Sequence, residues 1–130
     1  MENLYIIWSD RNQTGIPIID EQHRGIVSTI NSLHYFVQKG RGEDVIAPTL
    51  IMLKQYTNIH FSTEEDLVSK SEFPNKESHF SLHETFKNEI DYIYKDKNIF
   101  DKSDVILKFL KDWWLNHINV EDKKYVSFLG

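Results

Sequence analysis

Residues 50–64 read LIMLKQYTNIHFSTE, and this stretch places five side chains on one helical stripe: Leu50, Leu53, Thr57, His60 and Glu64. Steps of three or four residues are typical of the buried face of an amphipathic helix. A buried histidine or carboxylate is costly unless it is paired or binds a metal. The stretch therefore predicts a helix that carries two candidate metal ligands into the protein core.

Three further segments repeat this arrangement, with histidines on an apolar helical face. The four expected helices and their ligand candidates are about 19–38 with His23, about 44–70 with His60 and Glu64, about 76–94 with His79 and His83, and from 101–103 onwards with His117. Every expected helix thus contributes to one set of ionisable side chains on its apolar face.

Short connections join these helices, at 39–42, 71–75 and 95–98. Short loops between helices of similar length favour antiparallel neighbours. We predict an all-α protein with one domain over residues 1–130, folded as an up-down-up-down four-helix bundle. An irregular N-terminal arm precedes the bundle over 1–18, and a short C-terminal tail follows it over 122–130.

Local signals mark some of the helix ends. Pro48 is expected in the first turn of the second helix, where a missing N–H matters little. Asp101 and Ser103 are good caps for the fourth helix. The stripe of the second helix is expected to continue to Leu67.

The number of candidate ligands indicates how many metal ions they hold. Five histidines and two carboxylates, Glu64 and Asp122, are too many for one small ion and suit two ions that the carboxylates bridge. A shell rich in imidazole suits iron, zinc or copper. Asp122 follows His117 by five residues, about 140° around an ideal helix. We therefore predict a π-type turn or a helix end between them.

Composition excludes several classes of site. The chain has no cysteine, so disulfides, thiolate-bound clusters and a cysteine nucleophile are excluded. Its net charge is −5, and no block of lysine or arginine stands out, so we expect neither nucleic acid nor a membrane surface as a partner. The N-terminus does not look like a secretory signal, and we expect a cytoplasmic monomer.

At these motifs the chain resembles the hemerythrin family, and it is most similar to the bacterial single-domain members. The motifs are Ile19-Asp20-Glu21-Gln22-His23, His60-Phe61-Ser62-Thr63-Glu64-Glu65, His79-Phe80-Ser81-Leu82-His83, and His117 to Asp122 followed by Tyr125. Trp8 and Gly15 in the arm also fit. The resemblance covers almost the whole chain and includes all seven ligand positions.

The resemblance implies a non-haem centre of two iron ions with an oxo or hydroxo bridge. His79, His83 and His117 would hold one iron and His23 and His60 the other, while Glu64 and Asp122 would bridge both. Dioxygen would bind reversibly, end-on as a hydroperoxide, at the open position of the two-histidine iron. This implies an oxygen storage, delivery or scavenging protein rather than an enzyme.

The resemblance also implies an oxygen pocket, lined by Phe61, Trp113 and Ile118. The family usually has leucine where this chain has Trp114, three residues before His117. The larger ring either narrows the pocket or points away from it, which bears on oxygen affinity and on the autoxidation rate.

Three other functions stay open: a sensor of oxygen or iron that acts through a separate partner, a di-iron enzyme with peroxidase or nitric-oxide activity, and a structural zinc site. No histidine here has glutamate three residues before it, the pattern of ferritin-like di-iron bundles. His34 is expected to be structural or partly exposed, without a role as a ligand. Glu65 and Glu121 are expected to be solvated, whereas Gln22 and Asp20 are either partners of the ligands or a solvated helix start.

Overall fold

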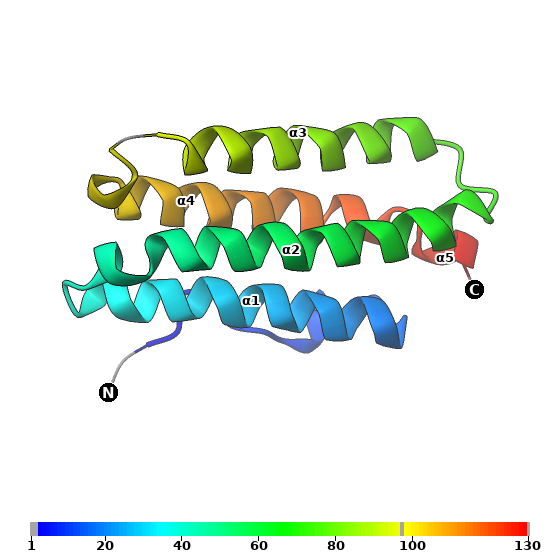
Figure 1. Ribbon diagram of the computed structural model, residues 1–130. Coiled ribbons are helices and arrows are strands. Elements are labelled where there is room, and N and C mark those ends of the chain that lie inside the picture. Colours follow the sequence, from blue (N-terminus) through cyan, green and yellow to red (C-terminus); the bar gives the residue numbers. More distant parts are fainter. Residues whose placement is uncertain (1–2, 97, 130) are drawn as a thin grey trace.

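The computed structural model describes residues 3–96 and 98–129 (Figure 1). Its helices are α1 (Pro17–Gln38), α2 (Gly42–Ser69), α3 (Lys76–Tyr94), α4 (Ser103–Trp113), the π-helix η3 (Trp114–Ile118) and α5 (Val126–Leu129), with short 3-10 turns η1 (Asp10–Asn12), η2 (Ile99–Asp101) and η4 (Glu121–Lys123). Lys97, in the turn expected at 95–98, lies outside the described residues, as do both ends of the predicted domain.

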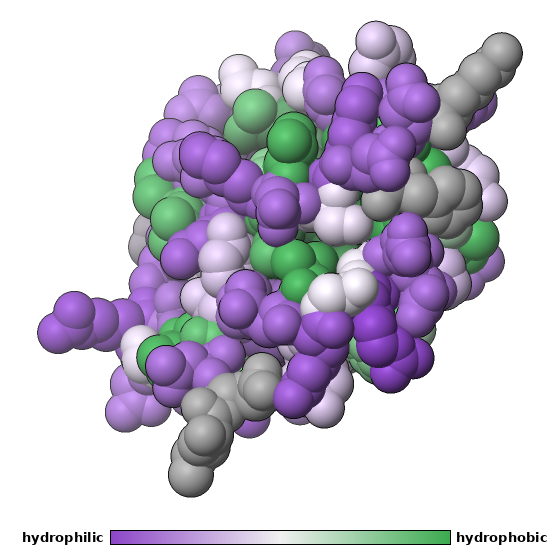
Figure 2. Space-filling view, turned by 90° about the vertical axis from the view of Figure 1, so that its left-hand side faces the viewer, coloured by the Kyte–Doolittle hydropathy of each residue, from purple (hydrophilic) through white to green (hydrophobic). Residues whose placement is uncertain are grey.

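The four long helices lie side by side and alternate in direction, which confirms the predicted all-α bundle (Figure 1). The connections between α1 and α2 and between α3 and α4 lie at one end, which Figure 2 views directly and which is mainly hydrophilic at its rim. The tail with α5 lies at the opposite end. Among the described residues, none of the helices combines the length and the apolar content that a membrane crossing requires.

Apolar side chains from all four helices fill the bundle interior, among them Ile30, Leu53, Ile90 and Leu110, each at most 1% exposed. A second, smaller apolar cluster closes the end near the tail and contains Val68, Phe73 and Tyr125. On α2 the buried stripe therefore ends on Val68; Leu67, which was expected there, is partly exposed.

Two details expected at the helix starts are wrong, namely the place of Pro48 in α2 and the capping residue of α4. Helix α2 begins at Gly42, so Pro48 lies inside the helix and not in its first turn. Gly42 is buried where a side chain would collide with Val37 and Ser103, so α2 packs closely from its first residue. Pro48 is exposed, which leaves water to satisfy the carbonyl group that loses its partner. In α4 the cap is Lys102, and Ser103 is already the first helical residue.

The N-terminal arm is irregular, as predicted, but ends earlier because Pro17 is the first residue of α1. The Asn31 side chain accepts hydrogen bonds from the backbone N–H groups of Tyr5 and Ile6 at 3.1 and 2.8 Å, and it donates to the Ile6 carbonyl at 2.8 Å. Asp20 accepts hydrogen bonds from Thr14. These bonds hold the arm against the bundle.

Candidate metal centre

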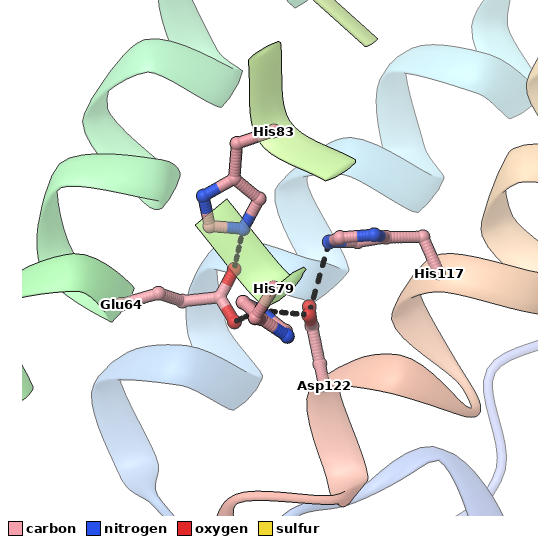
Figure 3. A group of neighbouring side chains, drawn as sticks. All are labelled: Glu64, His79, His83, His117 and Asp122. Carbon is pink, nitrogen blue, oxygen red and sulfur yellow. Dashed lines mark hydrogen bonds and ion pairs between the residues drawn. The ribbon is translucent and has the colours of Figure 1, made fainter. Parts of the chain in front are cut away.

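All seven candidate ligands lie together inside the bundle, near the end that the tail closes. None is more than 4% exposed. The contributing elements are α1 with His23, α2 with His60 and Glu64, α3 with His79 and His83, the π-helix with His117, and η4 with Asp122. Figure 3 shows five of these side chains pointing toward one another, with His79 and His83 both from α3 and the other three from α2, the π-helix and η4.

The predicted irregularity before Asp122 is confirmed. Residues 114–118 form a π-helix, and the Asn119 N–H donates to the Trp114 carbonyl, five residues back, at 3.1 Å. An extra residue in a turn rotates the chain that follows it. His117 and Asp122 therefore reach the same point, with His117 Nε2 3.1 Å from Asp122 Oδ1.

The two oxygens of Asp122 face two different groups of histidines. Oδ2 lies 3.0 Å from His23 Nε2 and 3.4 Å from His60 Nε2. Oδ1 lies 3.2 Å from His79 Nε2 and 3.1 Å from His117 Nε2. The carboxylate thus has one oxygen for each histidine group, which is the arrangement of a bridging ligand.

Glu64 also contacts both groups. Its Oε1 lies 2.9 Å from His60 Nε2 and 3.4 Å from His83 Nε2, and its Oε2 lies 3.3 Å from His79 Nε2. Ligand atoms within 4.8 Å of one another form two sets, Glu64, His79, His83, His117 and Asp122 in one, and His23, His60 and Asp122 in the other. Among the described residues, the cluster therefore offers two neighbouring metal positions.

Several of these atoms lack a hydrogen-bond partner within the described part of the chain. They include His83 Nε2 and His117 Nε2, together with Glu64 Oε1 and Asp122 Oδ1. The nitrogens lie close to the oxygens but not at the angles that a hydrogen bond needs. Because buried polar atoms are normally satisfied, this donor set fits metal ions held between the facing nitrogens and oxygens.

In the metal-free cluster, the histidines and the two carboxylates shift one another's pKa values. Burial opposes the charge of His60, but Glu64 and Asp122 outweigh it and raise the His60 pKa to about 9. His79 is affected in the same way, and its pKa is also raised to about 9. Burial alone would raise the pKa of Glu64 and Asp122, but the surrounding histidines hold both below their usual values. Metal ions entering this cluster must therefore displace protons.

Hydrogen bonds outside the cluster orient its histidines. The Gln22 side-chain oxygen lies 2.9 Å from His60 Nδ1, so Gln22 is a partner of the cluster, while Asp20 serves the arm. Glu65 Oε2 lies 2.8 Å from His83 Nδ1, so Glu65, which was expected only to be solvated, is also a partner of the cluster, although 39% of its side chain stays exposed. Glu65 points across to α3, a contact between helices that no spacing within α2 could indicate.

Aromatic rings surround the imidazoles. Phe61 is fully buried and stacks on His83, with ring centroids 3.9 Å apart. Trp113 stacks on His117 at 5.6 Å. Trp114 is 2% exposed and points inward, edge-on to His23 at 6.0 Å, and Ile118 is buried as well. Three of the expected pocket residues, Phe61, Trp113 and Trp114, thus have rings against imidazoles of the cluster, and the fourth, Ile118, is buried and follows His117 in the chain.

Tyr125 covers the cluster on the side of the tail. Its ring meets His79 edge-on at 5.4 Å, and the side chain is fully buried. Burial, together with the negative charges of Glu64 and Asp122, raises the Tyr125 pKa far above its usual value, so Tyr125 stays neutral. The sixth histidine, His34, lies apart from the cluster and stacks on Tyr5 at 4.7 Å. Glu121 is partly exposed and pairs with Lys124 at 3.0 Å.

Comparison with known proteins places this site in a family. The domain family described as the Hemerythrin HHE cation binding domain matches residues 14–129. The chain is 34% identical over 124 residues to a bacteriohemerythrin of Pseudomonas aeruginosa strain LESB58, which covers 95% of this chain and 80% of that relative. It is 26% identical to a bacteriohemerythrin of Clostridium acetobutylicum, over 93% of this chain and 98% of the relative.

Solved structures agree on the fold. A crystal structure of a hemerythrin variant superposes with a TM-score of 0.83, 24% sequence identity and 98% coverage of both chains. Among the sequence relatives, a hemerythrin-like protein of Naegleria gruberi is 29% identical over 94% of this chain and 92% of that relative. The buried cluster, the bundle and these matches agree with one another: the chain belongs to the hemerythrin family.

Proposed function

We propose that this protein binds dioxygen reversibly at a centre of two iron ions held by the seven clustered residues. His79, His83 and His117 hold one ion, and His23 and His60 hold the other. Glu64 and Asp122 bridge the two ions. The observation that carries this proposal is Asp122, whose two oxygens face the two histidine groups separately at 3.0–3.4 Å.

The difference between the two histidine groups supports a single place for dioxygen. Three imidazoles face one metal position, whereas only His23 and His60 face the other. The second position therefore has fewer protein ligands and is the open one. When bound, iron supplies the electrons that reversible dioxygen binding requires.

The chain's own residues keep this place dry. His23 and His60 are fully buried, and Phe61, Trp114 and Ile118 around the cluster are at most 2% exposed. Excluding water prevents proton leakage and side reactions at a reactive centre. We propose that these three residues, together with Trp113, line the dioxygen pocket.

Gln22 and Glu65 keep the imidazoles in place. Their oxygens lie 2.9 Å from His60 Nδ1 and 2.8 Å from His83 Nδ1, so each imidazole presents Nε2 to the cluster. Partners of this kind fix the tautomer and orientation of metal-binding histidines. The shell is rich in nitrogen and contains only two carboxylates among its seven residues, which favours a carrier over oxidation chemistry on a substrate.

The test combines metal analysis with spectroscopy. Purified protein supplemented with iron is expected to contain two ions per chain, and its visible spectrum is expected to change on exposure to air and return when oxygen is removed. Irreversible bleaching on exposure to air, or turnover of nitric oxide, indicates an enzyme instead. A spectrum that does not respond to oxygen, with one ion or none bound, contradicts the proposal.

A matched pair of variants tests the bridging role of Asp122. Asp122→Asn removes the charge between the two histidine groups and is expected to lose the second metal ion and oxygen binding. Glu121→Gln removes the same charge from the neighbouring, partly exposed residue and is expected to keep both. Equal metal content in the two variants refutes the bridge.

A further inference from the structure

Two tryptophans form a line from the metal cluster to the protein surface. The Trp114 ring lies edge-on to His23, with centroids 6.0 Å apart and an interplanar angle of 89°. Trp8, from the N-terminal arm, meets Trp114 at 5.9 Å and 47°. These separations are typical of aromatic rings in contact. Ring contacts alone thus connect a proposed iron ligand with the arm.

The outer end of this line is open to small molecules. Trp8 is partly exposed and lines a surface hollow of about 680 Å³ between the arm and α1. Arg24 is the one charged residue among the described residues that line this hollow, and its guanidinium carbon lies 5.2 Å from the Trp8 ring centroid. A small anion can therefore reach Trp8 although His23 is fully buried.

On the other side of the cluster a second indole, that of Trp113, is partly exposed and lines a separate hollow of about 270 Å³ together with His117. Trp113 stacks on His117 at 5.6 Å, but the ring on which it next stacks is that of Phe86, at 3.9 Å. An indole loses one electron readily, whereas the benzene ring of phenylalanine does not. Tyr125 also contacts His79, but its phenol is fully buried and meets the ring of Phe73 at 6.3 Å. Among the described residues, Trp114 and Trp8 therefore form the pair of indoles in contact that links the cluster with the arm.

We propose that Trp114 and Trp8 carry oxidising equivalents from the metal centre to the surface hollow when the centre reacts with hydrogen peroxide. This inference rests on the proposed function, because it requires bound iron. Reduction of one peroxide molecule to two water molecules takes two electrons, and two protons that come from solvent. Each electron passes from Trp114 to the centre. Trp8 then reduces the oxidised Trp114, and a small anionic reductant of the ascorbate class reduces the oxidised Trp8.

The surroundings of Trp8 favour return of an electron over permanent damage. Its Nε1 is buried and has no hydrogen-bond partner among the described residues, so the oxidised indole has no acceptor for its proton. The positive charge of Arg24 repels a positive indole and attracts an anionic donor. Oxidised Trp8 is therefore short-lived whenever such a donor is present.

The test locates oxidation products by mass spectrometry. Protein with measured iron content and oxygen binding is treated with hydrogen peroxide, with and without ascorbate. Without ascorbate, we expect oxygen to be inserted into Trp8, and ascorbate should suppress this product. In W114F, oxidation at Trp8 should be lost and damage should move to side chains around His23.

Two further variants keep the test independent of how well W114F folds. In W8F, oxygen should be inserted into Trp114 instead, because the side chain that would reduce oxidised Trp114 is missing. Y92F removes an exposed phenol of α3 and leaves both indoles in place, and its oxidation at Trp8 should match that of the parent protein.

The outcomes separate this inference from the proposed function. Equal oxidation of Trp8 in W114F, or in metal-free protein, overturns the electron path. Protein that binds iron and oxygen but shows no oxidation at Trp8 overturns the path alone. Protein that takes up no iron overturns the proposed function, and the path with it.

Discussion

The stability of the metal-free protein is expected to fall as pH rises from neutral to alkaline. The His60 pKa is raised from 6.5 to about 9, and that of His79 likewise. A histidine with a raised pKa stabilises the folded state fully below pH 6.5, and this stabilisation is lost as pH rises to about 9. A shift of this size corresponds to about 3 kcal/mol for His60, which is fully buried and therefore little screened.

The two histidines share Glu64 and Asp122, so their contributions do not simply add. We expect a total loss of between about 3 and 6 kcal/mol from pH 6.5 to 9. The carboxylates have lowered pKa values, and their contribution is lost only as pH falls below about 4.5. The metal-free protein should therefore be most stable between about pH 4.5 and 6.5.

Urea unfolding of chelator-treated protein at several pH values measures this dependence directly. His34 lies outside the cluster, so H34N should show the same slope against pH as the parent protein. Iron-loaded protein should lose less stability over this range, because metal binding requires neutral imidazoles and strengthens as protons leave. If the stability of the metal-free protein is constant or rises between pH 6.5 and 9, then protonated His60 and His79 do not stabilise the fold, and the reasoning is refuted.

Three further predictions concern single contacts. Replacing Glu65 with Gln weakens the bond to His83 Nδ1, and iron affinity measured by competition with a chelator should fall by about 10-fold or more, while the fold is kept. Leu53→Ala opens a cavity in the bundle core and should cost about 2–5 kcal/mol in urea unfolding, whereas Met52→Ala, at an exposed position, should cost less than about 1 kcal/mol. Asn31→Ala removes the bonds that hold the arm, so hydrogen exchange at the amides of Tyr5 and Ile6 should speed up while α1 stays protected.

The sequence by itself was enough to predict the bundle and the members of the cluster. Apolar residues three or four apart define a helical face from local geometry alone, and the ligand candidates lie on those faces. Even an irregularity near His117 followed from spacing, because His117 and Asp122 could not share a face on a regular helix, but spacing left open whether it was a π-type turn or a helix end. These features depend on residues close together in the chain.

Contacts between distant residues were decided only by the tertiary structure. Glu65 looked solvated along α2, and its partner His83 comes from the neighbouring helix. The direction of Trp114 could not be predicted, because its ring packs against Trp8 of the arm, a residue far away in the chain. Nor did spacing indicate that each oxygen of Asp122 would face its own histidine group. Packing between elements fixes such orientations, and the periodicity of a single segment contains no information about that packing.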